Sequence, residues 1–345
     1  MKAVAFRADG ELDAVEVMDL PAPTPGEGEA VVRVRAAALN HLDIWVRKGR
    51  PGMESPMPHV LGSDAAGVVE AVGPCVEGVK PGDEVVLNPG ISCGRCEFCR
   101  RGEQSLCRDF EIVGATRPGT FAEMVAVPAE NLYPKPEHLC FVEAAALPLV
   151  HLTAWRMLMT RAELKPGETV LIHGIGGGVA LAALQIAKVA GAEAIVTSSS
   201  DEKLRRAKEV GADRTINYAK ADVAQEVKSI TQGAGVDVVI DAVGAATFVI
   251  DMQVVRRGGR VVLCGVTTGA KARIDLQSLY WNQVSVLGST MGSHEDFCRL
   301  LRAVNVTGLK PVVDFVLPLD HAKEAMRRME EGEQFGKIVI EISGG

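Results

Sequence analysis

The stretch "VLIHGIGGGVALAALQIAK" (residues 170–188) has an apolar run, a cluster of glycines and a helical pattern; the glycines are Gly174, Gly176, Gly177 and Gly178. At a strand-to-helix turn, residues without side chains let a pyrophosphate approach backbone N–H groups at the positive end of the helix. The full G-x-G-x-x-G spacing is not met, because Ala180 occupies the last small-residue position. A tight turn before a packed helix would use the same glycines, so the surrounding pattern has to decide.

Strand and helix patterns alternate after this glycine loop. Apolar runs at 193–199, 235–244 and 260–266 are separated by helical patterns such as 201–213 and 247–259, and the run "SVLGSTMG" (285–292) ends the series. Before the glycine loop, residues 141–159 also have helical apolar spacing, which we expect Pro148 to break or bend. Continuous apolar strands alternating with helices predict a parallel sheet that is covered on both faces. The predicted fold class is therefore α/β with a doubly wound Rossmann domain, and we interpret the glycine loop as a nucleotide site.

The rest of the chain has a different sequence pattern. Short alternating patterns such as "VVRVRAAAL" (31–39) are bounded by Gly and Pro, and after the Rossmann pattern come two helical patterns and a last strand, "KIVIEI" (337–342). Because 345 residues exceed what one hydrophobic core supports, we expect two domains. These are a β-rich domain of residues 1–150 and 291–345, and a Rossmann domain of residues 151–290.

Composition excludes several classes of partner. The net charge is −7 and no basic run is longer than Arg205–Arg206 or Arg327–Arg328, so nucleic acid is not expected to bind. The N-terminal residues lack the apolar core of a signal peptide, and the longest apolar stretch, Gly174–Ala187, is too short to span a bilayer. We therefore expect a cytoplasmic protein that acts on a small molecule without a membrane partner.

The end of the second strand pattern bears on which dinucleotide binds. An acidic residue there would accept hydrogen bonds from the ribose hydroxyls of NAD. This chain has "VTSSSDEKLRR" (196–206), whose strand we expect to end near Ser198 with hydroxyls and no carboxylate. Ser198, Ser199 and Lys203 are candidates to hold the 2′-phosphate of NADP(H), which we favour over NAD(H). The alternative is that the serines cap the next helix, with Ser199 and Glu202 forming a capping box.

Four cysteines lie within "SCGRCEFCRRGEQSLCR" (92–108) at the spacing C-x2-C-x2-C-x7-C: Cys93, Cys96, Cys99 and Cys107. Four thiolates close a tetrahedral shell around zinc and leave no position open for substrate. An iron–sulfur cluster is the rival, since successive C-x2-C steps also suit it. We predict one structural Zn²⁺ that pins a loop of the β-rich domain.

The whole chain resembles the medium-chain dehydrogenase/reductase superfamily in the order of its parts. A β-rich domain, a cysteine lobe, a dinucleotide domain and a return to the first domain follow one another, and the cysteine spacing is similar to that of zinc alcohol dehydrogenases. The resemblance implies a GroES-like fold for the β-rich domain and NAD(P)-dependent oxidoreductase activity. It also implies a homodimer or homotetramer, and the apolar edge run 285–292 indicates the same.

The catalytic-zinc positions depart from this resemblance. Zinc alcohol dehydrogenases carry a Cys just before an H-x-D motif, where this chain has Asn40 in "ALNHLD". They carry His-Glu in "GHE", where this chain has Ser63 and Asp64, and a third Cys where it has Leu149. Asn and Ser are poor zinc ligands and Leu is none, so we expect no catalytic zinc.

The same segments are similar to zinc-free quinone oxidoreductases and enoyl reductases of the superfamily, which lack the cysteine lobe. The resemblance implies hydride transfer from NADPH to an activated C=C bond, as in an enone, a quinone or an enoyl thioester such as acryloyl-CoA. Charge then gathers on the carbonyl oxygen, which requires a donor. Asn40 is the first candidate for that donor, and an amide that bonds its own backbone is the alternative. His41, Ser63 and Asp64 are the other candidate catalytic residues.

Two of the remaining candidate cofactor residues, Lys337 and Thr153, follow from the resemblance. Lys337 in "FGKIVI" matches a position near the pyrophosphate, with a solvated strand-end lysine as the alternative. Thr153 would contact the nicotinamide or cap a helix, and Val179 and Tyr218 complete the set.

Two other functions remain open at this point. One is an alcohol dehydrogenase whose catalytic zinc uses displaced ligands such as His41, Asp64 and His151. The other is a non-catalytic NADPH-binding protein.

Overall fold

The structure is a computed structural model that describes residues 1–49 and 56–342. The chain divides into two compact units: unit 1 comprises Met1–Val150 and Gly292–Gly345, and unit 2 comprises His151–Met291. The division falls one residue from the domain boundary expected at 290/291. Among the described residues, no helix is both long enough and apolar enough to cross a bilayer.

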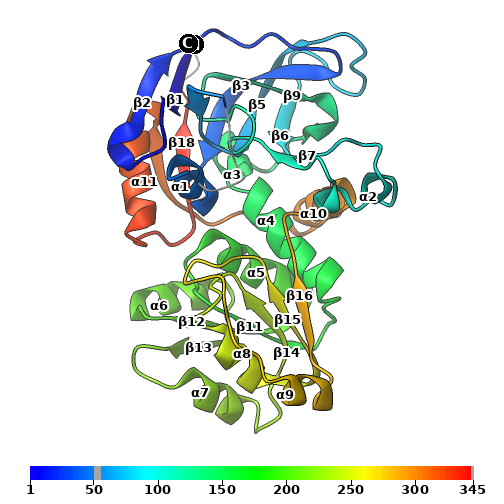
Figure 1. The fold of residues 1–345 in the computed structure, drawn as a ribbon, viewed down its shortest axis with the longest axis vertical. Helices are drawn as coiled ribbons and strands as arrows, with labels where there is room; N and C mark the ends of the chain where they lie inside the picture. The colour runs from blue at the N-terminus through cyan, green and yellow to red at the C-terminus, as the bar shows by residue number, and fades with distance from the viewer. Residues whose placement is uncertain (50–55, 343–345) are drawn as a thin grey trace. The chain divides into compact units, whose positions relative to one another are not determined.

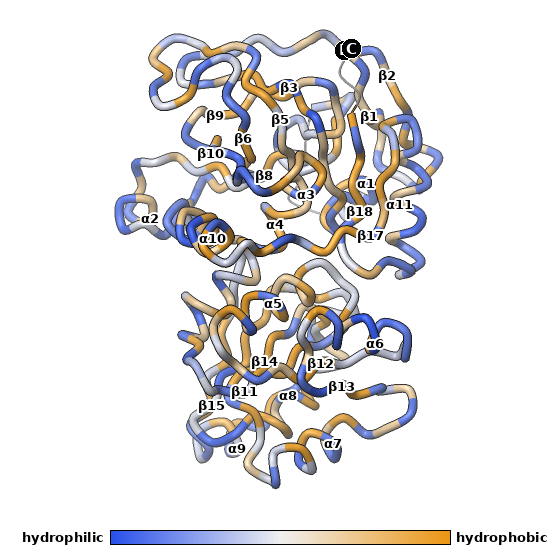
Figure 2. The backbone as a smooth tube through the Cα atoms, turned by 180° about the vertical axis from the view of Figure 1, so that it is seen from behind, coloured by the Kyte–Doolittle hydropathy of each residue, from blue (hydrophilic) through white to orange (hydrophobic). Residues whose placement is uncertain are grey.

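Unit 2 is built on a six-stranded parallel sheet in the order β13-β12-β11-β14-β15-β16 (Figure 1). The strands are β11 (Thr169–Ile172), β12 (Glu193–Ser198), β13 (Arg214–Asn217), β14 (Val236–Asp241), β15 (Val255–Leu263) and β16 (Ser285–Gly288). The helices are α5 (Gly178–Val189), α6 (Asp201–Val210), α7 (Val223–Ile230), α8 (Phe248–Val254) and α9 (Leu276–Trp281). Figure 2 shows the central strands as apolar along their length, as expected of strands buried on both faces.

The strand order reverses direction at β11, which makes the sheet doubly wound. Helix α5 packs on β11 and β12, and α8 packs on β14 and β15. Right-handed crossovers on either side of β11 place the two sets of helices on opposite faces of the sheet. In such sheets a ligand binds at the carboxyl ends of the strands where the order reverses, which here is the turn after β11. The predicted Rossmann domain is confirmed.

Unit 1 holds a seven-stranded sheet in the order β10-β6-β5-β3-β18-β17, with β9 also paired to β3, and smaller sheets β2-β1-β4 and β7-β8. Its strands are β1 (Lys2–Phe6), β2 (Val15–Asp19), β3 (Glu29–Ala38), β4 (His59–Val60), β5 (Asp64–Val72), β6 (Glu84–Leu87), β7 (Gly90–Ile91), β8 (Glu111–Ile112), β9 (Met124–Pro128), β10 (Leu132–Pro134), β17 (Val313–Pro318) and β18 (Lys337–Glu341). Its helices are α1 (His41–Arg47), α2 (Glu97–Arg100), α3 (Phe141–Ala145), α10 (His294–Thr307) and α11 (Ala322–Glu330).

The last strand completes the main sheet of unit 1. β18 pairs antiparallel with β3 and parallel with β17, although it follows β3 by about three hundred residues in the chain. Its apolar residues Ile338 and Ile340 enter the same buried core as Val32 and Val34 of β3. The returning segment is therefore part of the fold of unit 1 rather than an appendage.

Two local expectations meet different outcomes. A helical pattern interrupted by Pro148 becomes two helices, α3 and α4 (Pro148–Trp155), with Pro148 as the first residue of α4. That position suits proline because its missing N–H would have no partner in the first turn. By contrast, the helical pattern over 247–259 is too long: α8 ends at Val254, and β15 begins at Val255.

Candidate active site

The four clustered cysteines converge in unit 1. Cys96 precedes α2, Cys99 lies within it, and Cys107 follows a short 3-10 turn (Gln104–Leu106). All four Sγ atoms lie within 4.8 Å of one another, and the Sγ atoms of Cys96 and Cys99 are 3.4 Å apart. A tetrahedral zinc with Zn–S bonds of about 2.3 Å needs sulfur atoms about 3.8 Å apart, so the cage fits zinc.

The electrostatics of the cage also suit a cation. Backbone N–H groups, first that of Cys99, lower the pKa of Cys96 to about 6. Burial raises the pKa of Cys107 to about 12, and a bound cation would favour the thiolate there. Among the described residues, these cysteines form the only group of three or more His, Cys, Asp or Glu side chains that converge as metal ligands.

A second polar cluster of unit 1 gathers at the start of β18. Lys337 is 3% exposed, and its Nζ donates to Leu39 O (2.6 Å), Asn40 Oδ1 (2.7 Å) and Asp64 Oδ2 (2.9 Å). Asn40 Nδ2 also donates to Asp64 Oδ2 at 2.9 Å, while Leu149 N donates to Asp64 Oδ1 at 2.8 Å. We call Asn40, Asp64 and Lys337 the buried triad; its charges and hydrogen bonds are satisfied within unit 1.

Asp43 adjoins this triad from the first turn of α1. Its Oδ2 accepts the backbone N–H of Asn40 at 2.7 Å, as part of a capping box in which Asn40 is the N-cap. Burial raises the pKa of Asp43 to about 7, opposed by the Asn40 N–H and by the charge of Lys337. The α1 cap therefore fixes the backbone of Asn40 beside the triad.

The contacts in the structure bear on three expectations about these residues. Lys337 is not a solvated strand-end lysine, and its three donors are used within unit 1, which argues against the pyrophosphate contact. Asn40 is 4% exposed and donates its amide hydrogens to Asp64 and, at 3.4 Å, to Ala38 O, so it has no amide N–H left for a substrate carbonyl. Asp64 is fully buried and already accepts three hydrogen bonds.

The other catalytic candidates differ in their surroundings. His41 is exposed at the start of α1, with its ring edge-on to Trp45 at 5.1 Å. Ser63 is fully buried, and its Oγ has no hydrogen-bond partner among the described residues. His151 is buried and contacts Gln185 at 3.2 Å through Nε2. Ser63 is thus the candidate whose hydroxyl is uncommitted.

The glycine loop of unit 2 joins β11 to α5 as predicted. Gly174 and Gly176 have φ of +68° and +119°, which residues with a Cβ rarely adopt. Gly177 is the N-cap of the twelve-residue α5, which begins at Gly178 and Val179, and no side chain caps this end. The N–H groups of the first turn are therefore available to an anion, and the loop fits the pyrophosphate of a dinucleotide.

The candidates for the 2′-phosphate gather at the carboxyl ends of β12 and β13. β12 ends at Ser198, as expected, and the backbone N–H of Tyr218 donates to Ser198 O at 3.1 Å. Ser198 is buried, whereas Ser199 and Tyr218 are exposed. The alternative of a capping box formed by Ser199 and Glu202 is not met, because Ser200 is the N-cap and accepts from Lys203 N at 3.3 Å.

The first carboxylate that follows this strand end in the sequence is directed elsewhere. Asp201 accepts from Asn217 Nδ2 at 2.6 Å and forms an ion pair with Lys220. Of the remaining candidates, Thr153 is buried in unit 2, with its Oγ1 4.0 Å from Met291 Sδ.

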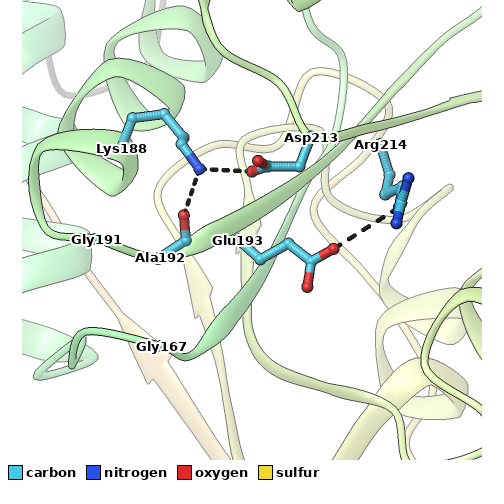
Figure 3. A pocket seen from close by; sticks show the side chains of 7 residues that line it. All are labelled: Gly167, Lys188, Gly191, Ala192, Glu193, Asp213 and Arg214. Carbon is cyan, nitrogen blue, oxygen red and sulfur yellow. Dashed lines mark hydrogen bonds and ion pairs between the residues drawn. The ribbon is translucent and has the colours of Figure 1, made fainter.

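An open pocket of about 460 Å³ lies at the end of the unit 2 sheet that is opposite to the glycine loop (Figure 3). Glu193 and Arg214 begin β12 and β13, so the pocket sits at the amino ends of the strands, away from the glycine loop. Lys188 donates to Ala192 O (2.7 Å) and pairs with Asp213 (2.6 Å). The charged side chains that line the pocket pair with one another, Lys188 with Asp213 and Arg214 with Glu193, so we assign the pocket no role in the reaction.

Sequence reasoning missed the contact between Lys337 and Asp64. The signal was present, because a lysine inside the apolar strand "FGKIVI" requires a buried counter-charge. It also missed Thr120, whose Oγ1 donates to Asp64 O at 2.9 Å.

Comparison with known proteins supports this description of the fold. Residues 26–137 match the family described as alcohol dehydrogenase GroES-like domain, and residues 178–305 match that described as zinc-binding dehydrogenase. An NAD-dependent alcohol dehydrogenase of Sulfurisphaera tokodaii is 34% identical over 94% of this chain and 96% of its own length.

Solved structures of alcohol dehydrogenases are also similar to this chain. One described as an NAD-dependent alcohol dehydrogenase is 50% identical, with a TM-score of 0.95 over 99% of this chain and 100% of its own. A cobalt- and zinc-bound thermostable alcohol dehydrogenase from Pyrobaculum aerophilum is 37% identical, with a TM-score of 0.89 over 99% of both chains. The chain therefore belongs to the medium-chain dehydrogenase/reductase superfamily of NAD(P)-dependent oxidoreductases.

Proposed function

We propose that this chain is an NADP(H)-dependent reductase of activated C=C bonds that carries one structural Zn²⁺ and no catalytic zinc. The observation that carries this proposal is the buried triad. At two of the positions where zinc alcohol dehydrogenases have metal ligands, this chain has the amide of Asn40 and the carboxylate of Asp64, and the ammonium of Lys337 from β18 donates to both. Because the ammonium of Lys337 already forms an ion pair with the carboxylate of Asp64, this carboxylate is a poor ligand for a second cation.

The reaction needs a donor for the carbonyl oxygen of the substrate. When bound, the reduced nicotinamide supplies a hydride to the electron-poor β-carbon, and a proton from water completes the saturated product. We assign the donor role to Ser63, whose hydroxyl has no partner among the described residues, in place of Asn40. Asn40, Asp64 and Lys337 would then hold the backbone next to Ser63 in place.

The preference for NADP(H) rests on the end of β12. Ser198, Ser199 and Lys203 are close in sequence there, and the backbone N–H of Tyr218 donates to the carbonyl oxygen of Ser198. The nearby carboxylate of Asp201 forms an ion pair with Lys220. A phosphate monoester carries roughly −1.5 to −2 charge, which favours hydroxyls and a lysine over a free carboxylate.

The names of the relatives favour a second candidate, an NAD-dependent alcohol dehydrogenase. One experiment separates the two. Purified protein is analysed for zinc, then assayed for NADPH oxidation with enones, quinones, enoyl-CoA thioesters and ketones, and for NAD⁺ and NADP⁺ reduction with alcohols. Our proposal expects one zinc per chain and turnover of an activated alkene. Two zincs per chain, fast alcohol oxidation and inactivity toward every alkene would favour the second candidate.

We also propose a homodimer built on the edge strand β16. Leu276, Tyr280 and Trp281 of α9 are each about two-thirds exposed, at 65%, 65% and 67%, and Val286 of β16 is 37% exposed. An edge strand next to exposed aromatic side chains suits pairing with a second copy across a twofold axis. Light scattering at micromolar concentration should give at least twice the mass of one chain, and a monomer would refute it.

A further inference from the structure

A chain of buried polar groups lies directly behind the glycine loop of unit 2. His173 follows β11, Thr197 lies in β12, and Asp251 lies in α8; they are 3%, 1% and 0% exposed. No site residue discussed above belongs to this group. A buried histidine and carboxylate are costly to keep in a core unless hydrogen bonds satisfy them, so their contacts deserve an explanation.

A series of hydrogen bonds connects Asp251 in α8 to the glycine loop. His173 Nε2 lies 2.8 Å from Asp251 Oδ1, and Nδ1 lies 3.2 Å from Thr197 Oγ1. With Asp251 ionised, Nε2 carries the proton and Nδ1 accepts the hydroxyl hydrogen of Thr197. The same hydroxyl oxygen then accepts the N–H of Gly174 at 3.4 Å.

A second bond fastens the next residue of the loop to the same strand position. Ile175 N donates to Thr197 O at 2.8 Å. Thr197 thus holds two consecutive loop residues, one through its side chain and one through its backbone. This fixes Gly174 at its positive φ and sets the direction in which the chain enters α5.

The neighbouring carboxylate does not compete for His173. Asp241, at the end of β14, accepts the N–H groups of Val243 (2.6 Å) and Gly244 (3.0 Å) and the hydroxyl of Thr247 (2.8 Å). The pKa of Asp251 is raised to about 7, by burial first and also by the charge of Asp241, while the hydrogen bond from His173 opposes this rise. Asp241 is therefore held by donors of residues 243–247, and Asp251 accepts the hydrogen bond from His173.

We infer that His173 and Asp251 are positioning residues that act through Thr197 to hold the glycine loop in the form that receives the pyrophosphate of a dinucleotide. The inference rests on the proposed dinucleotide binding and adds residues that do not touch the cofactor. It predicts a loss confined to ligands that contain the pyrophosphate. A ligand that occupies only the adenosine and 2′-phosphate region should be insensitive.

The experiment compares two probes on matched variants of the full-length, zinc-loaded protein. Thr197→Val removes the hydroxyl and keeps the branched shape, whereas Thr197→Ser keeps the hydroxyl. The dissociation constants of NADPH and of adenosine 2′-monophosphate are measured by calorimetry, and folding is checked by thermal melting. Thr197→Val should weaken NADPH about 5- to 10-fold, on the order of one hydrogen bond, and adenosine 2′-monophosphate less than about 2-fold. Thr197→Ser should restore most of the NADPH affinity.

A second pair of variants tests the histidine itself. His173→Asn keeps a polar atom near the place of Nδ1, whereas His173→Gln keeps a donor near the place of Nε2. We expect NADPH affinity to be better retained in His173→Asn than in His173→Gln. Equal weakening of both probes in each variant, or no weakening of NADPH, would overturn the inference. A wild-type protein that binds neither NADPH nor NADH would instead overturn the proposed function.

Discussion

Replacing Lys337 with methionine tests whether the buried triad is a unit. Methionine keeps most of the length and apolar volume of the lysine stem but removes the charge. Asp64 would then remain fully buried with the amide of Asn40 and the N–H of Leu149 as its donors. The double variant Lys337→Met with Asp64→Asn removes both charges and leaves two groups of similar shape.

The expected magnitude follows from the geometry. Two unit charges 2.9 Å apart attract by about 6 kcal/mol at an effective dielectric of about 20, and the loss of solvation offsets most of this. Removing one partner leaves an uncompensated buried charge, which costs about 3–5 kcal/mol. We therefore expect Lys337→Met to lower the free energy of unfolding of unit 1 by about 3–5 kcal/mol, and the double variant to be more stable than Lys337→Met.

The assay needs a signal from unit 1 alone. Trp45 lies in α1, while Trp155 and Trp281 lie in unit 2, so a Trp155→Phe/Trp281→Phe background leaves Trp45 as the reporter. Urea unfolding of zinc-saturated protein then gives the stability of each corner of the double-mutant cycle. The coupling energy should reach about 2–3 kcal/mol. Additive effects, with less than about 1 kcal/mol for Lys337→Met, would refute the reasoning.

Four further outcomes are expected. Cys96→Ser should release the metal and lower the melting temperature while NADPH affinity of the folded protein is kept; lost activity at unchanged zinc content and stability would make the lobe catalytic. Ser63→Ala should lower kcat for an enone on the order of 100-fold with little change in the Kd for NADPH, whereas an equal loss in both would assign Ser63 to structure. Ser198→Asp should shift the ratio of kcat/KM for NADPH and NADH toward NADH, and an unchanged ratio would remove Ser198 from the 2′-phosphate site. Because Asp43 has a pKa raised to about 7 in the fold against about 3.8 in the unfolded chain, the native state holds its proton more tightly, and this stabilisation is lost as pH rises through about 7. Asp43→Asn should therefore gain stability relative to wild type between about pH 4 and 7, by at most about 1.4 kcal/mol per pH unit in urea titrations, and a flat difference would contradict the shift.

Local signals predicted most of the fold. The alternation of apolar runs with amphipathic helices identified the Rossmann sheet, and the four cysteines identified their own cage, because each signal lies within one short segment. Errors arose where two patterns shared a segment: at 247–259, "VVRR" continues a helical period but opens β15. Three consecutive serines offered several caps, and only the backbone conformation selects Ser200.

The candidate site was less accessible to sequence reasoning. Asn40, Asp64 and Lys337 were each identified, yet with separate roles, because no local pattern reports that residues 64 and 337 meet across a sheet. The pairing of β18 with β3 decides this contact, and long-range strand pairing leaves no period in either strand. The hydrogen bonds of Asn40 to Asp64 and Lys337 follow from the same contact, and they are the reason that we propose Ser63 in place of Asn40 as the donor.

The discontinuity of unit 1 has a consequence for biosynthesis. During translation, unit 2 is complete once Met291 has left the ribosome, whereas the main sheet of unit 1 lacks β18 until residues 337–341 emerge. Until then Asp64 has no lysine beside it, so the nascent first unit carries an unpaired acid in its core. We expect unit 2 to fold first, and the late arrival of Lys337 to make closure of unit 1 the slower stage of folding.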